Sequence, residues 1–212
     1  MPRILSGLAP RLARGAALLA AAVLSLAAAG SAQTLVDVAE HPERPVVVEL
    51  FSSQSCGNCP EANRNLAELA KRTDVIALTY PVGLWDYLGW EDTFARPEFA
   101  ERQKRYNRAL GHRGPYTPQI VFGGRYHSSG VNLKSIAQGF AQRDLKPYPA
   151  TVTFSGEGLA LDGPADAAGE VVLVRFRPGV VKMTPGEGAN QGKAMSYFNL
   201  VTGYETLGRW SG

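Results

Sequence analysis

Two cysteines, Cys56 and Cys59, form a Cys-x-x-Cys pattern, and the 212-residue chain contains no other cysteine. A nearly continuous apolar run, Pro45–Phe51, precedes them, and a segment of helical periodicity begins at Pro60. At a helix N-terminus, free N–H groups and the helix dipole stabilise a thiolate, which is the nucleophile of thiol–disulfide exchange. The pattern therefore predicts a pair that cycles between dithiol and disulfide.

The two cysteines are expected to act unequally. Cys56 lies in the loop ahead of the helix, so we expect it to be exposed, to be the more reactive thiolate and to attack. Cys59 is followed by Pro60, which suits the first turn of a helix, so we expect it to be buried and to resolve the mixed disulfide.

Other interpretations of the pair remain open. A disulfide that only staples the chain would close a ring of four residues, which adds about 2 kcal/mol of stability at most. A zinc site would need further ligands, but a second cysteine pair is absent and the three histidines show no ligand spacing. A Cu(I)-handling protein could use both thiolates with His127 as third ligand. A redox-inert binding module is the remaining alternative, and no cofactor is predicted.

The elements that position the cysteines alternate between short apolar runs and helical periodicities, which is typical of an α/β fold. This texture extends from Val36 to Arg143. We expect strands at Pro45–Phe51 and Val75–Tyr80, helices at Pro60–Arg72 and Glu98–Leu110, a hairpin over Gln119–His127, and a helix capped by Asn132 that carries Leu133, Ile136, Ala137 and Phe140.

The texture changes after Arg143. Lys146–Pro149 has the composition of a linker, and a Gly-rich stretch with strand-like runs follows it. The sequence therefore predicts a first domain over 33–145 and a small C-terminal all-β module over 146–212. Its expected strands are Ala150–Phe154, Leu159–Leu161, Glu170–Arg177 and Lys193–Thr202.

A second motif, Tyr116-Thr117-Pro118 followed by an apolar strand and Gly123-Gly124, strengthens this interpretation. Together with the strand–CxxC–helix order, it resembles the cis-proline loop and final hairpin and helix of thioredoxins and glutaredoxins. The resemblance covers Val46 to about Phe140. It implies a thioredoxin-like fold in which the Thr117–Pro118 bond is cis and lies against Cys56, although most X–Pro bonds are trans. The Thr117 backbone would then be free to pair with an extended substrate.

Longer stretches resemble a family of secreted bacterial thioredoxin-like proteins of unknown function. The matching segments are VVELFSSQSCGNCP, GLWDYLGWEDTFARPEFAERQKRY, YTPQIVFGG, GANQGKAMSYFNLV and LGRWSG. The resemblance implies the fold and the compartment but names no substrate. Relatives continue beyond the position of Trp210, so we expect the C-terminal module either to be incomplete or to pack on the first domain.

Glu49 is the one charged residue in the apolar strand. It could be a strand carboxylate that a neighbouring group satisfies. Alternatively, a buried carboxylate at this position could accept a proton from the second cysteine. Thioredoxins carry a comparable acid one position nearer to the first cysteine, and the resemblance therefore implies a catalytic Glu49 only if the loop 52–55 absorbs this offset.

Aromatic residues gather between the second strand and the following helix. Trp85, Tyr87 and Trp90 could belong to the core, or they could form a wall that binds a peptide or a small thiol. Tyr116, which precedes Thr117 in the second motif, is predicted to bind substrate with them. His112 and His127 are expected to be structural or solvent-exposed, because no spacing places them beside the cysteines.

The first 32 residues have the features of a secretory signal. Arg3, Arg11 and Arg14 precede an apolar run at 15–29, and cleavage is expected after Ala32, with an uncleaved anchor as the alternative. These three arginines account for the excess of 22 basic over 19 acidic residues, so the mature chain is neutral. Nucleic acids and anionic membranes are therefore not expected partners. We expect a periplasmic or secreted protein that reacts with thiols and disulfides of proteins or small molecules.

Overall fold

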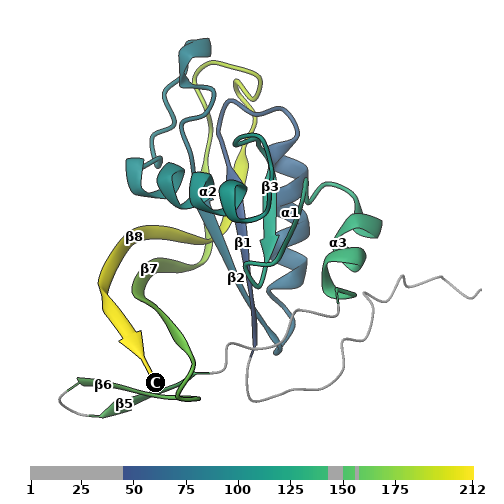
Figure 1. The fold of residues 1–212 in the computed structure, drawn as a ribbon. Helices are drawn as coiled ribbons and strands as arrows, with labels where there is room; N and C mark the ends of the chain where they lie inside the picture. The colour runs from purple at the N-terminus through teal and green to yellow at the C-terminus, as the bar shows by residue number, and fades with distance from the viewer. Residues whose placement is uncertain (1–44, 143–149, 156–157) are drawn as a thin grey trace, which may run out of the picture. The chain divides into compact units, whose positions relative to one another are not determined.

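A computed structural model describes residues 45–142, 150–155 and 158–212 of the chain. The predicted signal sequence, 1–32, and the predicted linker, 146–149, lie outside these residues. The elements in chain order are β1 (Val46–Ser52), α1 (Cys59–Leu69), β2 (Val75–Pro81), the 3-10 turn η1 (Asp86–Leu88), α2 (Pro97–Ala109), β3 (Gln119–Phe122), β4 (Tyr126–Ser128), α3 (Leu133–Phe140), β5 (Thr151–Ser155), β6 (Gly158–Asp162), β7 (Ala168–Met183) and β8 (Met195–Ser211) (Figure 1).

Strand β1 lies in the middle of a six-stranded mixed sheet of order β4-β3-β1-β2-β8-β7. It pairs in parallel with β2, from Val46 opposite Val75 to Ser52 opposite Pro81, and antiparallel with β3. The carboxyl end of β1 therefore lies beside the carboxyl end of β2 and the start of β3. The mixed α/β class predicted from the alternating pattern is confirmed, and so are the strand–helix–strand and hairpin–helix segments.

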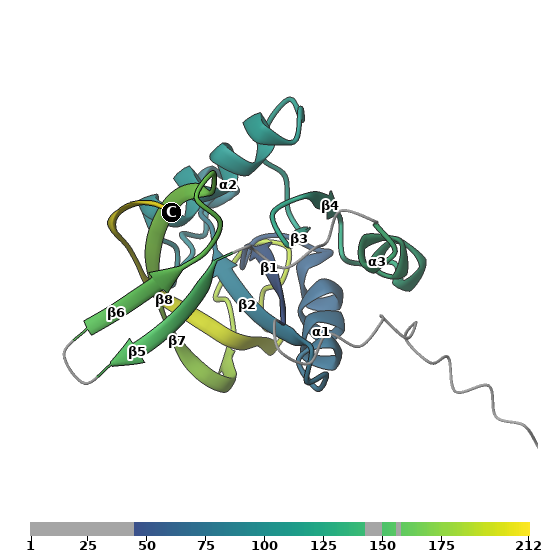
Figure 2. The ribbon, with the colours of Figure 1, turned by 60° about the horizontal axis from the view of Figure 1, so that its bottom comes forward.

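The alternation of side chains along β1 assigns its two faces to different helices. Val48 and Leu50 pack against α1 and α3 in one buried cluster, whereas Phe51 packs against α2 in a second cluster. Figures 1 and 2 show α1 and α3 on one side of these strands and α2 on the other. Because complete burial of one such side chain contributes about 1.5–3 kcal/mol, both clusters hold the end of β1 in place.

Local sequence signals explain where the helices begin. Pro60 occupies the first turn of α1, where its missing N–H leaves no hydrogen bond unmade. Helix α3 begins after Asn132, whose side chain accepts a hydrogen bond from the N–H of Lys134 at 2.7 Å. This confirms the predicted N-cap.

The C-terminal strands extend the same sheet. β7 and β8 form a long antiparallel pair, and β8 lies next to β2, where Thr79 is opposite Leu200. Thr79 Oγ1 donates to the carbonyl of Phe198 at 2.7 Å, and Asn199 Nδ2 donates to the carbonyl of Ala77 at 3.0 Å. The expected strands are therefore present, and β8 packs on the first part of the chain, which is one of the two possibilities that the sequence left open. The domain boundary at 145–146 stays a prediction.

The β5–β6 hairpin forms a separate two-stranded sheet. Among the described residues, no helix has the length and apolar character needed to cross a membrane.

Candidate functional site

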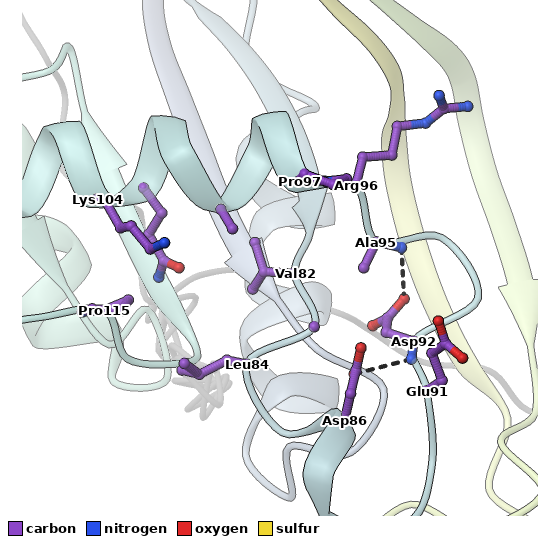
Figure 3. A pocket seen from close by; sticks show the side chains of 13 residues that line it. Val82, Leu84, Asp86, Glu91, Asp92, Ala95, Arg96, Pro97, Lys104 and Pro115 are labelled. Carbon is purple, nitrogen blue, oxygen red and sulfur yellow. Dashed lines mark hydrogen bonds between the residues drawn. The ribbon is translucent and has the colours of Figure 1, made fainter.

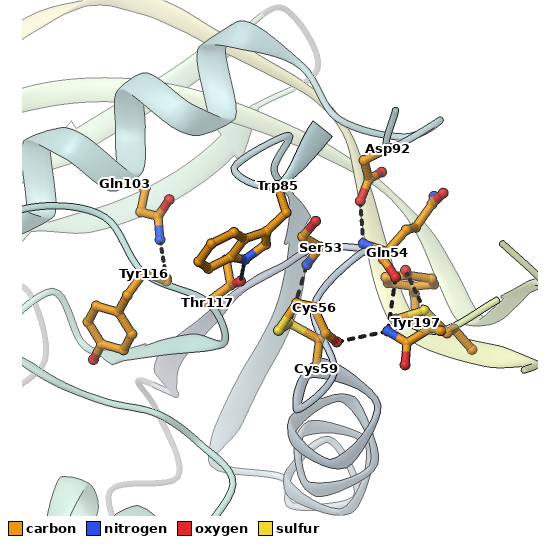
Figure 4. The surroundings of a disulfide bond; sticks show 12 residues. Ser53, Gln54, Cys56, Cys59, Trp85, Asp92, Gln103, Tyr116, Thr117 and Tyr197 are labelled. Atoms are coloured by element: carbon orange, nitrogen blue, oxygen red, sulfur yellow. Dashed lines mark hydrogen bonds between the residues drawn. A yellow bond between two sulfur atoms is a disulfide. The ribbon is translucent and has the colours of Figure 1, made fainter. Parts of the chain in front are cut away.

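Cys56 and Cys59 form a disulfide at the carboxyl end of β1 (Figure 4). Cys59 is the first residue of α1, and Cys56 lies in the turn that connects β1 to this helix. The N–H of Cys56 donates to the carbonyl of Ser53 at 3.2 Å, and the N–H of Cys59 donates to the carbonyl of Cys56 at 3.1 Å. These bonds close the turn, so both sulfur atoms lie at the helix N-terminus, where the sequence predicts them.

The disulfide is more buried than expected. Cys56 is only 6% exposed and Cys59 is fully buried. The expectation that Cys56 is exposed is therefore wrong in degree, although the predicted order of access to the two residues is correct. The reason is that β8 covers this end of the sheet and packs three buried side chains against the cysteines, namely Met195, Tyr197 and Leu200.

A backbone donor points at the inner sulfur. The N–H of Ser53 donates to Cys59 Sγ at 3.4 Å, in a buried position. A hydrogen bond to sulfur favours the charged thiolate over the thiol after reduction, and the positive end of the α1 dipole acts in the same direction. The geometry can therefore stabilise a thiolate on either cysteine once the disulfide opens.

Two side chains that the sequence analysis missed hold the turn between β1 and α1. Asp92 Oδ2 accepts the N–H of Gln54 at 2.8 Å. Asn190 Nδ2 donates to the carbonyls of Gln54 and Cys56 at 2.9 and 2.8 Å. Both side chains are buried, and burial raises the pKa of Asp92 to about 6 although its hydrogen bonds with backbone N–H groups act against this. A buried polar residue far away in the sequence gives no local signal of such contacts.

The cis-proline motif faces the disulfide across a small hollow. The Thr117–Pro118 bond is cis, as the motif predicts. Thr117 and Cys56 line the same hollow of about 290 Å³. Trp85 Nε1 donates to Thr117 Oγ1 at 2.7 Å, which fixes one wall of the hollow (Figure 4). The remaining lining residues are Ser55, Gly57, Asn58 and Leu88.

The predicted aromatic wall is present only in part. Trp85 lines the hollow, and the ring of Tyr87, which is 75% exposed, lies 6.1 Å from the Trp85 ring. Trp90 is not a lining residue, since its Nε1 donates to Gln54 Oε1 at 2.7 Å and it supports the turn. Leu88, 56% exposed, lines the hollow and was missed. Because Leu88 directly follows Tyr87, which was predicted to bind substrate, its place in the sequence could have indicated that it lines the site.

Tyr116 lies apart from the hollow's lining. Its hydroxyl group is hydrogen-bonded to His127 Nδ1 at 2.8 Å, and its ring also lies 5.0 Å from the ring of His112. Burial raises the pKa of Tyr116 to about 12, and burial together with His112 lowers the pKa of His127. The structure therefore groups Tyr116 with the two histidines and does not bring His127 to the cysteines as a copper ligand.

Glu49 also lies apart from the cysteines. It is 2% exposed and forms a bidentate ion pair with Arg102 of α2, with N···O distances of 2.7 and 2.9 Å. Tyr106 donates a hydrogen bond to the same carboxylate. Glu49 thus points to the α2 face, whereas Cys59 belongs to α1 on the opposite face. The alternation along β1 was a signal for this, because Glu49 shares its parity with Phe51 and not with Leu50.

A second hollow of about 430 Å³ lies on the α2 side (Figure 3). Carboxylates of Asp86, Glu91 and Asp92 line one part, and Arg96 and Lys104 are also among its lining residues. Asp86 Oδ1 accepts the N–H of Asp92 at 3.0 Å. Within the described part of the chain, no three His, Cys, Asp or Glu side chains are arranged to hold a metal ion.

Comparison with known proteins decides the family. The sequence profile of a family described as "Protein of unknown function (DUF1223)" matches residues 47–212. The chain belongs to the DUF1223 family. No curated protein gives a significant match.

Two solved structures are similar to this DUF1223 protein. One is a protein of Agrobacterium tumefaciens with a known crystal structure, which is 35% identical with a TM-score of 0.63; the match covers 79% of this chain and 74% of that one. The other is HBP35 of Porphyromonas gingivalis, which is 14% identical over 78% of this chain and 62% of that one, with a TM-score of 0.47. The second likeness is too weak to indicate fold or function. The disulfide at Cys56 and Cys59 is consistent with a redox-related function of this family member.

Proposed function

We propose that this DUF1223 protein is a thioredoxin-like thiol–disulfide oxidoreductase of the periplasm or the extracellular space. One observation carries the proposal. The Cys56–Cys59 disulfide at the start of α1 opens onto a hollow that is also lined by Thr117, the residue before a cis-proline. A redox-active pair needs a helix N-terminus to stabilise its thiolate and an accessible place for the partner sulfur, and this arrangement supplies both.

The topology supports a thioredoxin-like assignment. The units β1–α1–β2 and β3–β4–α3 form a sheet segment of order β4-β3-β1-β2, with the cysteines after the central strand. The succession of these two units along the chain is the one that the sequence resemblance implies. Fold analogy alone does not establish an activity, so the proposal rests on the disulfide and its surroundings.

The proposed reaction has two steps. The Cys56 thiolate attacks one sulfur of a substrate disulfide, the substrate S–S bond breaks, and the second substrate sulfur leaves as a thiolate that takes up a proton. Cys59 then attacks Cys56 Sγ, its proton passes to the first substrate sulfur, and this sulfur leaves as a thiol. Two electrons pass from the protein dithiol to the substrate, and the reverse sequence oxidises a substrate dithiol.

Named groups of the chain serve these steps. The Ser53 N–H and the α1 N-terminus stabilise the Cys59 thiolate, and burial protects it from other reactants. The Thr117 backbone, which makes no hydrogen bond within the described part of the chain, offers its N–H and C=O to an extended substrate. Glu49 has no part in the proposed proton transfer, because its carboxylate is held by Arg102 on the other face of the sheet.

The proposed compartment rests on two sequence features. The predicted signal over 1–32 would export the chain, and disulfides persist mainly in oxidising compartments. Direct fractionation of cells that express the full-length chain tests this part of the proposal.

A redox titration tests the proposed function. The purified protein is equilibrated in buffers of stepped glutathione or dithiothreitol ratio, and the free thiols are trapped and counted by mass. We expect a reversible transition of two thiols per chain, with a tenfold change in ratio for about 30 mV. A disulfide that resists every buffer would support an inert module. A reduced form that retains Cu(I) against strong chelators and does not exchange with disulfides would support the copper alternative.

A further inference from the structure

The chemistry of the hollow beside Cys56 indicates which disulfides it accepts. Among the described residues that line it, Cys56 is the only titratable group, and none of them is a lysine or an arginine. An anionic small thiol such as glutathione carries two carboxylates, and a site for it would present a cation to at least one of them. The hollow presents none.

The outer wall of the hollow is apolar and exposed. Leu88 is 56% exposed and Tyr87 next to it is 75% exposed, while Trp85 continues the wall inward to Thr117. Large apolar side chains that adjoin one another on the surface commonly mark a place where a partner binds. Here Trp85 and Leu88 line the hollow that contains the reactive sulfur, and the ring of Tyr87 lies 6.1 Å from that of Trp85.

Backbone groups supply a second kind of contact. The N–H and C=O of Thr117 are free within the described residues, and Thr117 lies two residues before β3. An extended peptide can add to such a backbone as a short strand, and its side chains then alternate between the hollow and the solvent. The hollow of about 290 Å³ has room for one apolar side chain of such a peptide.

Charges around the rim favour a polypeptide over an anion. Glu187 lies beside Gly89, with its Oε2 atom 3.6 Å from where a Cβ would stand, so a carboxylate flanks the turn that carries Leu88. On the loop that approaches Gly57, Lys193 donates to the carbonyl of Ala189 at 3.4 Å and is exposed. Lys193 is therefore the cation to test as an alternative anchor for an anionic thiol.

We propose that the substrate is a cysteine within an extended polypeptide that carries an apolar residue beside it, and that Leu88 selects this residue. The inference rests on the proposed function, since it names the substrate class of the same site. The step concerned is the first one: Cys56 forms the mixed disulfide with the peptide cysteine while the peptide's former sulfur partner leaves as a thiolate.

The test measures this step alone. The reduced Cys59→Ser variant reacts with synthetic peptides whose single cysteine is joined to 5-thio-2-nitrobenzoate, and release of the yellow thiolate gives the rate. Two peptides differ only in Leu or Glu beside the cysteine, and mixed glutathione–thionitrobenzoate is the third probe. We expect the Leu peptide to react about tenfold faster than the other two, which corresponds to about 1.4 kcal/mol.

Matched variants locate the preference. Leu88→Ser, in the Cys59→Ser background, should reduce the preference for the Leu peptide to about twofold. Leu207→Ser, a change of an equally exposed leucine on β8, should leave it unchanged. Glu187→Gln should accelerate the glutathione probe and not the Leu peptide. Lys193→Gln should change neither rate.

Three results would overturn the inference. They are equal rates for the three probes, a preference that survives Leu88→Ser, and loss of the glutathione reaction in Lys193→Gln. Failure of the proposed function itself looks different, because Cys56 would then form no mixed disulfide with any probe, including the thionitrobenzoate dimer.

Discussion

The side-chain amide of Asn190 donates a hydrogen bond of 2.8 Å to the backbone carbonyl of Cys56. Asn190 is 1% exposed and lies 134 residues further along the chain, in the loop between β7 and β8. The bond fixes the carbonyl of Cys56, so it holds the turn that carries the Cys56 sulfur in one conformation. The loop between β7 and β8 is thus part of the proposed site.

Replacement of Asn190 by Ala should affect both stability and reactivity. The carbonyl of Gln54 would lose its donor in a buried place, and we expect a loss of about 1–3 kcal/mol in the free energy of unfolding. The rate of alkylation of Cys56 in the reduced protein should also change, because the turn that carries its sulfur would lose two hydrogen bonds. Urea unfolding and a pH series of iodoacetamide labelling measure the two effects. Gln191→Ala, in the exposed part of the same loop, is the control, and an unchanged labelling profile in Asn190→Ala would refute the prediction.

Asp92 should make stability fall with rising pH. Burial raises its pKa from 3.8 to about 6, so the protonated form is favoured in the folded chain. Its contribution is greatest below pH 4 and is lost as the pH rises through 6, a difference of about 3 kcal/mol. In Asp92→Asn this dependence disappears, and the variant should gain stability relative to the wild type between pH 4 and pH 7. If the free energy of unfolding changes by the same amount between pH 4 and pH 7 in the wild type and in Asp92→Asn, the prediction is wrong.

The ion pair of Glu49 and Arg102 should matter for folding and not for exchange. Arg102→Met leaves a carboxylate of 2% exposure without its cation, and we expect a loss of about 3–5 kcal/mol. Arg105→Met, on the exposed side of the same helix, should cost far less. Glu49→Gln should keep the rate of mixed-disulfide formation within about twofold of wild type wherever the protein is folded, because no proton passes through it. A slower rate with an altered pH profile would restore Glu49 as a proton acceptor.

Two glycines of the β7–β8 loop offer a matched pair of tests. Gly188 and Gly192 both have positive φ, 79° and 69°. A Cβ on Gly188 would lie 2.8 Å from Ser55 Oγ, beside the reactive turn, whereas a Cβ on Gly192 would meet nothing within 4 Å. Both Ala variants should lose about 1 kcal/mol from the backbone. Only Gly188→Ala should also change the rate at which reduced Cys56 is labelled. Equal labelling rates in both variants would show that the close approach of Gly188 to Ser55 does not affect Cys56.

Local patterns in the sequence were sufficient to predict the position of the cysteines at the start of a helix and the cis bond at Pro118. The apolar run before Cys56, Pro60 after Cys59 and the Thr117–Pro118 motif are continuous segments, and the structure has them where they were expected. The conformation of each segment depends mainly on residues adjacent in the chain, and helix and strand propensity and hydrophobic periodicity describe such local effects.

Distant contacts account for what the sequence did not reveal. Gln54 meets Asp92 and Asn190 across 38 and 136 residues, and a buried polar side chain has no pattern that names its partner. The addition of β8 to the sheet joins Thr79 to a segment about 120 residues away, which covers Cys56 and reduces its exposure. The orientation of Glu49 could have been inferred from the alternation along β1, but its partner, Arg102, lies on a helix whose packing only the fold determines.

Trapping of mixed disulfides by single-cysteine variants shows directly whether Cys56 and Cys59 exchange with substrate disulfides. Cys59→Ser and Cys56→Ser are each expressed with the full-length chain, thiols are blocked by acid and alkylation, and covalent partners are identified by non-reducing electrophoresis and mass spectrometry. We expect Cys59→Ser to accumulate mixed disulfides through Cys56, because no second thiol resolves them. Cys56→Ser should accumulate none, because Cys59 is fully buried. Partners trapped by Cys56→Ser alone, or by neither variant, would contradict this expectation.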